Sequence, residues 1–196
     1  MRRRQFIAGS SAILATGGLA LTGCTTTSLS ARDGSSEDTA KRATINTGID
    51  STLARLYNSV NGSRELIGKA RGVLVFPSVI AAGFWIGGQY GEGALRVDGR
   101  TTGYYTTVGG SFGLQIGAQS KAIIFAFMNQ EALDRFLQSQ GWAAGADATV
   151  AVVKVGANGN IDTSTAASPV EAFVLTNAGL MAGISLEGTK ISRLVI

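Results

Sequence analysis

Residues 108–128 carry the pattern that most restricts how this chain can fold. Over residues 111–119, apolar residues alternate with serine, glycine and glutamine. A period of two places the apolar side chains on one face of a strand and the glycines and amides on the other. From Ala122 the chain continues with seven uninterrupted apolar residues, AIIFAFM, which is typical of a strand covered on both faces or of a short core helix. The pattern predicts a hairpin of one half-exposed strand and one buried central strand.

Helical periodicity appears before and after this hairpin. Between Thr39 and Val60, apolar residues recur at three- and four-residue steps and predict an amphipathic helix. A short helix over residues 63–70 with Ser63 as its N-cap, and another from Asn129 to about Ser139, are also expected. The apolar stripe of the first helix consists of Ile45, Ile49, Leu53, Leu56 and Val60. The inner face expected for the last helix consists of Leu133, Phe136 and Leu137, with Glu131 and Arg135 as an exposed pair.

The remaining apolar segments read as short strands separated by turns. Asp98-Gly99 and Asn158-Gly159 are two-residue turn signals, and Pro77 is expected to end the first strand. The expected strands cover residues 72–76, 80–90, 92–97, 101–107, 148–155, 170–176, 182–187 and 191–196. Together these elements predict an α+β fold: an antiparallel, β-rich, barrel-like or sandwiched sheet with an N-terminal amphipathic helix and one further helix. Residues 39–196 are long enough for one domain.

Composition excludes several kinds of catalytic site. The 196 residues include no histidine and a single cysteine, Cys24. This excludes histidine-based metal sites, serine–histidine and cysteine–histidine nucleophile pairs, and an internal disulfide. Residues 109–113 match G-x-S-x-G, but that motif needs a histidine partner and a strand-turn-helix. Acidic residues form no pair suited to acid–base catalysis. We therefore expect no catalysis, no metal and no cofactor.

The N-terminal segment reads as an export signal. Three arginines at positions 2–4 precede an uncharged, largely apolar run, and Leu21-Thr22-Gly23-Cys24 resembles a bacterial lipobox. A membrane-spanning helix is disfavoured because the run is short and contains three glycines. The signal would comprise residues 1–23, with acylated Cys24 and a flexible tether through residue 38. Thr25 directs the anchor to the outer membrane under the bacterial sorting rule; Arg3-Arg4 leaves twin-arginine and general export both open.

Charge is distributed unevenly along the chain. The formal charge of +4 becomes +1 without the three leader arginines, which gives no basic excess for binding nucleic acid. Segment 41–71 nevertheless has six basic and two acidic residues. Either these residues form the solvated face of a packed helix, or they meet anionic lipid headgroups at about 1 kcal/mol per cation. The basic residues are Lys41, Arg42, Arg55, Arg64, Lys69 and Arg71.

Glycines recur at four-residue steps in three places. The residues around these glycines are too polar for the segments to be membrane-spanning helices. On a strand they leave one flat face that a helix, another backbone or an acyl chain can approach closely. We favour packing of the N-terminal helix on this face over a ligand groove. The candidate glycines are Gly83, Gly87, Gly91, Gly109, Gly113, Gly117 and Gly183.

Four ordered stretches resemble the SYLF domain family. They are ARGVLVFP from Ala70, GFWIGGQYGEG from Gly83, GGSFGLQIGAQ from Gly109 and AGLMAGISLEGTKI from Ala178. Residues 103–107 (GYYTT) resemble the bacterial branch of the family. The resemblance implies membrane-lipid binding through a basic, amphipathic N-terminal region, which corresponds to segment 41–71 by position and charge. The actin and phosphoinositide functions of eukaryotic members are not expected in a bacterial envelope.

These observations predict an exported lipoprotein, anchored to the outer membrane by a covalent N-terminal acyl group and facing the periplasm. The expected partners are membrane phospholipids, bound by the basic helix and the adjoining glycine-lined sheet. The alternative is a structural envelope protein whose exposed surface binds another protein.

Overall fold

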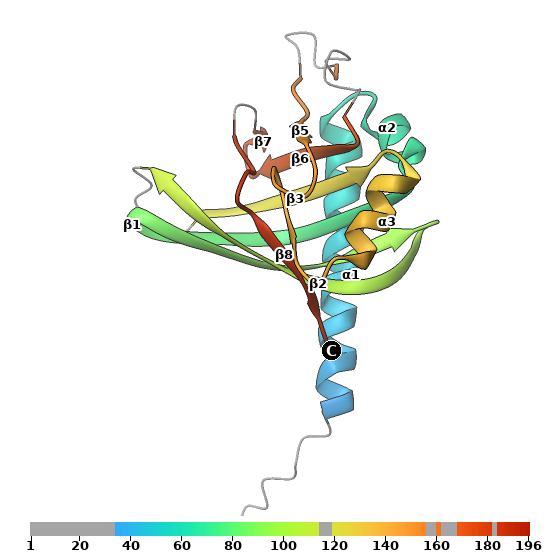
Figure 1. The fold of residues 1–196 in the computed structure, drawn as a ribbon, viewed down its shortest axis with the longest axis vertical. Coiled ribbons are helices and arrows are strands. Elements are labelled where there is room, and N and C mark those ends of the chain that lie inside the picture. The colour runs from blue at the N-terminus through green and yellow to red at the C-terminus, as the bar shows by residue number, and fades with distance from the viewer. Residues whose placement is uncertain (1–33, 114–118, 156–159, 162–167, 182–183) are drawn as a thin grey trace, which may run out of the picture. The chain divides into compact units, whose positions relative to one another are not determined.

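A strongly curled sheet with helices on both faces forms the fold (Figure 1). The computed structural model describes residues 34–113, 119–155, 160–161, 168–181 and 184–196, and all of them lie in one compact unit. The helices are α1 (Gly34–Ser59), α2 (Ser63–Lys69) and α3 (Gln130–Gln138). The strands are β1 (Gly72–Val97), β2 (Arg100–Gly113), β3 (Gln119–Phe127), β4 (Trp142–Ala143), β5 (Val150–Val152), β6 (Val170–Thr176), β7 (Gly179–Leu180) and β8 (Lys190–Leu194). The α+β class predicted from the sequence is confirmed.

Strand order corrects the hairpin predicted over residues 111–128. The order is β4-β8-β2-β1-β3-β6-β5, with β7 paired to β6, so β1 lies between β2 and β3. The two halves of the predicted hairpin therefore pair with β1 and not with each other. All pairs among these strands are antiparallel except β5–β6, which is parallel. The buried strand expected over residues 148–155 is reduced to the three residues of β5.

β1 is one continuous strand of 26 residues, where three separate strands were expected. Its first part pairs with β3 and its second part with β2. Pro77 does not end the strand, because the β1–β3 register shifts between Phe76 and Val79. A proline at a bulge removes no ladder hydrogen bond. The predicted turn after β1 is confirmed: Asp98 and Gly99 have φ of 50° and 75° and connect β1 to β2.

The two halves of β1 approach each other through glycine. A Cβ on Gly93 would lie 2.1 Å from the carbonyl oxygen of Val75, and one on Gly91 would lie 2.9 Å from that of Ser78. No real side chain tolerates such distances, so both positions require glycine for steric reasons. This close backbone approach brings residues 91–93 against residues 75–79 and holds β1 in its curled course.

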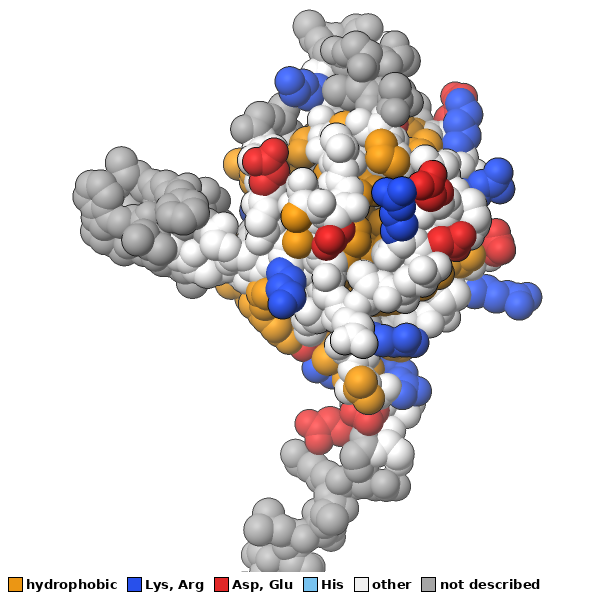
Figure 2. Space-filling model, viewed as in Figure 1, with side chains coloured by type: hydrophobic (Ala, Val, Ile, Leu, Met, Phe, Trp, Pro, Cys, Tyr) orange, Lys and Arg blue, Asp and Glu red, His pale blue; other side chains and the backbone are white. Residues whose placement is uncertain are grey.

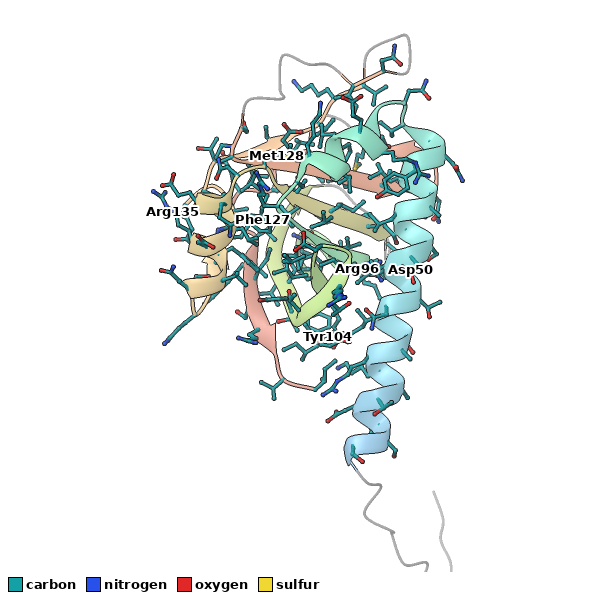
Figure 3. The ribbon with its side chains drawn as sticks, turned by 90° about the vertical axis from the view of Figure 1, so that its right-hand side faces the viewer. Asp50, Arg96, Tyr104, Phe127, Met128 and Arg135 are labelled. Carbon is teal, nitrogen blue, oxygen red and sulfur yellow. The ribbon has the colours of Figure 1, made fainter. Side chains whose placement is uncertain are left out.

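Each face of the sheet carries its own hydrophobic core (Figure 3). On one face, α3 covers an aromatic cluster in which Trp142 lies 5.8 Å from both Phe125 and Phe136, measured between ring centroids. On the other face, α1 and α2 cover alternate residues of the same strands, such as Val75 and Ile124. Six of the seven apolar residues of AIIFAFM thus lie in the central strand β3, as one of the two sequence interpretations predicted, and Met128 follows it. Their side chains alternate between the two cores.

The helices follow their sequence signals in most respects. The side chain of Asn129 accepts a hydrogen bond of 2.8 Å from the Ala132 amide, which confirms it as the N-cap of α3. Ser63 is not a cap: Gly62 occupies that position, and the Ser63 hydroxyl donates to the Val60 carbonyl. Leu137, expected on the inner face of α3, is exposed, and Ala132 is buried with Leu133 and Phe136 instead. The Asn158-Gly159 turn lies outside the described residues.

Replacing Gly93 by alanine is predicted to destabilise the fold by about 3 kcal/mol, because the new methyl group overlaps the Val75 carbonyl and the backbone must shift. Gly88→Ala is the matched control in the same strand, since nothing lies within 4 Å of its Cβ position. Urea unfolding of both variants measures the free energy of unfolding. Equal stabilities for the two variants would contradict a steric requirement at Gly93.

Candidate functional site

The apolar stripe of α1 packs on the sheet as the sequence predicted. Ile45, Ile49, Leu56 and Val60 are buried, and Leu53 packs partly buried against the same core. A glycine of the helix, rather than a glycine of the sheet, lets α1 and the sheet approach closely at this point. A Cβ on Gly48 would lie 2.9 Å from the Cβ of Pro77 in β1.

Two of the six predicted basic residues fasten α1 to the sheet. Lys41 forms a salt bridge of 2.8 Å with Glu92 of β1. Arg42 donates a hydrogen bond to the carbonyl of Ile196, and its guanidinium lies 6.0 Å from the ring centroid of Tyr104. These contacts occupy the two cations with groups of the protein itself.

The other four basic residues are exposed on the C-terminal half of α1, on α2 and just after it. Arg64 lies over the ring of Tyr57 at 4.3 Å, and Lys69 pairs with Glu65 at 2.7 Å in a surface ion pair of small energetic value. For Arg55 and Arg71, the described part of the chain offers no side-chain hydrogen bond or ion pair. These two guanidinium groups are available to an external anion.

A polar seam that the sequence did not reveal holds the middle of α1. Arg96 of β1 forms a salt bridge of 2.6 Å with Asp50, and its side chain is 17% exposed (Figure 3). Asn46 donates to the Tyr104 hydroxyl at 3.0 Å and accepts from Thr101 at 2.8 Å. Partners separated by about 50 residues leave no local pattern, so sequence reasoning had no signal for this seam.

Two of the candidate glycines, Gly91 and Gly109, meet other parts of the sheet rather than α1. The atoms nearest to a Cβ on Gly91 belong to Ser78 and Val79, and those nearest to one on Gly109 belong to Gln89. The favoured interpretation, packing of the helix on the glycines, is therefore wrong at these two positions, where strand residues approach. Gly83, Gly87 and Gly113 lie within strands. Gly117, Gly183 and Cys24 lie outside the described residues.

A cavity of about 310 Å³ lies between α2 and the sheet. Its walls combine the apolar side chains of Leu66, Met128 and Ile161 with three charged residues. Glu65 and Lys69 come from α2, and Glu171 comes from β6. Figure 3 shows Met128 beside α2, and it directly follows the last residue of β3.

Glu171 is the most unusual of these residues because it is a buried acid within an apolar strand. It has no exposed surface, and neither carboxyl oxygen has a hydrogen-bond partner among the described residues. Its side chain shares the α2 side of β6 with Phe173, since alternate residues face the same way. Burial raises the pKa of the Glu171 carboxyl above its usual value. Sequence reasoning missed this residue, although a lone glutamate in VEAFVL was an available signal.

Replacing Glu171 by glutamine is predicted to remove a pH dependence of stability. Because the folded-state pKa exceeds the usual value of 4.5, the folded protein holds this proton more tightly than the unfolded chain. The resulting stabilisation is fully present below the usual pKa and is lost as the pH rises through the raised pKa. The free energy of unfolding of Glu171→Gln, relative to the wild type, should therefore increase with pH across that window.

Urea unfolding of both proteins between about pH 4 and pH 8 measures this difference. The pKa of neighbouring Glu65 is lowered by the hydrogen bond from Lys69 and contributes the opposite slope, but it does so in both proteins. A difference that stays constant with pH would show that Glu171 has the same pKa folded and unfolded.

None of the helices among the described residues is both long and apolar enough to cross a membrane. No group of three or more histidine, cysteine, aspartate or glutamate side chains is arranged there to hold a metal ion. On the face shown in Figure 2, basic and acidic side chains are interspersed, and neither sign forms a continuous patch.

Comparison with known proteins gives two matches. The Ysc84 family model, described as Las17-binding protein actin regulator, matches residues 108–194. SH3 domain-containing YSC84-like protein 1 of Xenopus laevis is 30% identical over 132 residues, which is 65% of this chain and 39% of the frog protein. This chain therefore spans about two fifths of the length of that relative. The family match includes Glu171. It begins at residue 108 and therefore does not cover segment 41–71.

Proposed function

This chain belongs to the Ysc84 (SYLF) domain family, and from that premise we propose that it is a non-catalytic lipoprotein of a bacterial envelope whose domain binds membrane phospholipids. The surface that we assign to the membrane comprises Arg55 of α1 and Arg71 after α2, with Arg64 and Lys69 of α2 between them in sequence.

The observation that carries this proposal is the division of the basic residues into two groups. Lys41 and Arg42 are bound to Glu92 and Ile196, so they serve the fold. Arg55 and Arg71 are exposed without side-chain partners in the described structure. Each cation close to an anionic bilayer contributes about 1 kcal/mol of attraction. Two such residues together contribute about 2 kcal/mol, which adds to the attachment that a covalent anchor provides.

The proposed anchor is an acyl group on Cys24. The lipobox Leu21–Cys24 and the charged, apolar leader before it support export and acylation. Thr25 supports an outer-membrane destination with the domain facing the periplasm.

A second candidate function is binding to an envelope protein. Ile80, Tyr90 and Val108 of β1 and β2 are 53%, 50% and 41% exposed, and Tyr90 pairs directly with Val108. Large exposed apolar side chains that adjoin one another favour a protein contact. Its surface differs from the one assigned to the membrane, so the two functions are separable by mutation.

Residues 25–196, which contain the compact unit but lack Cys24, are predicted to co-sediment with phosphatidylcholine vesicles that contain phosphatidylglycerol and less with pure phosphatidylcholine. The double variant Arg55→Gln, Arg71→Gln should bind the anionic vesicles about 30-fold more weakly, since two cations are removed at about 1 kcal/mol each.

The matched control is Arg100→Gln with Lys154→Gln, which removes the same charge from exposed positions on β2 and after β5. Its vesicle binding should remain within about threefold of the parent protein. Equal absence of binding to both kinds of vesicle would refute phospholipid binding, and equal losses in the two double variants would refute the assigned surface.

A further inference from the structure

We propose that the cavity beneath α2, lined by Glu171, is a binding site for the ammonium group of a small amphiphilic amine. This inference stands apart from the proposed membrane surface, because it rests on residues of the cavity and on none of the exposed arginines.

The carboxylate supplies the first argument. Glu171 lies in β6, between β3 and the edge strand β5, where it pairs with Ala126 and Ala151, and its two oxygens lack partners in the described structure. A buried ionised carboxylate without a partner is costly, so the group either keeps its proton or binds a cation. An ammonium ion offers three hydrogen-bond donors and a full positive charge, which satisfy both oxygens once the side chains that cover the carboxyl move aside, since neither oxygen has exposed surface in the structure.

The walls of the cavity supply the second argument. A volume of about 310 Å³ is at the lower end for small-molecule sites. Leu66, Met128 and Ile161 present apolar surface suited to a short alkyl chain. A ligand that combines a cationic head with a few methylene groups therefore fits both the chemistry and the size.

The other charged groups leave a net negative site. Among the cavity residues, Glu65 and Lys69 form their own ion pair of 2.7 Å, with both side chains largely exposed. The Lys69 ammonium is thereby held by Glu65 rather than by Glu171. The Glu171 carboxyl, by contrast, has no hydrogen-bond partner among the described residues.

Two sources offer this chemistry: a free amine, or the ethanolamine headgroup of a phospholipid. Isothermal titration calorimetry of the full chain at neutral pH with n-butylammonium, and with dihexanoyl phosphatidylethanolamine below its micelle concentration, distinguishes them. We expect binding of at least one of these probes. A preference for n-butylammonium assigns the site to free amines, and a preference for the lipid assigns it to the headgroup.

n-Butanol is the matched ligand control, because it has the same alkyl chain and no charge. Glu171→Gln is the matched protein variant, and it should weaken binding of the amine probe about 10-fold or more while keeping the shape of the side chain. Glu131→Gln makes the same change at an exposed carboxylate of α3, away from the cavity, and should alter binding less than threefold. Ile161→Trp fills the cavity and should also abolish binding.

Three results would overturn the proposal. The first is that neither amine probe binds. The second is that n-butanol binds as strongly as n-butylammonium, and the third is that amine binding is unchanged in Glu171→Gln. Vesicle binding by Arg55→Gln, Arg71→Gln is independent of all three, so failure of this site leaves the proposed membrane surface standing.

Discussion

The approach of the Gly93 backbone to the Val75 carbonyl is the contact on which the rest of the structure depends. It lets one strand of 26 residues pair with β3 along its first part and with β2 along its second. A β-carbon at position 93 would force the halves of β1 apart, and the curled sheet would open. Both hydrophobic cores are built on this sheet, so the sheet determines where α1, α2 and α3 pack.

The packing of α1 on the sheet in turn determines which of the nearby charged residues contact the rest of the protein and which remain exposed. Lys41, Arg42 and Asp50 meet partners on β1 or at the C-terminus, and these contacts fix the helix along its length. Arg55 and Arg71 lie beyond these contacts and remain exposed. A basic helix therefore does not act as a single charged surface. The charged residues that contact the sheet or the C-terminus stabilise the fold. Only the exposed arginines are free to contact a membrane.

Local patterns in the sequence predicted elements well and their pairing poorly. The apolar stripe of α1, the Asp98-Gly99 turn and the Asn129 cap depend on neighbours a few residues away, and all three are confirmed. The hairpin over 111–128 was wrong because β1, from a distant part of the sequence, lies between its strands. Gly93 lies two residues after Gly91 and is therefore outside the four-residue glycine steps. Glu171 was missed because the significance of a buried acid depends on the cavity that α2 closes.

Site-directed spin labelling tests the central claim, that the outward basic residues around α2 meet the membrane, most directly. Gly68 accepts a labelled cysteine because nothing lies within 4 Å of its Cβ position, and exposed Lys154 serves as the reference site. On addition of phosphatidylglycerol vesicles to residues 25–196, the account predicts that the label at 68 becomes less accessible to a water-soluble nickel complex and more accessible to oxygen. The label at 154 should not change. A response at 154 with none at 68 would contradict the account.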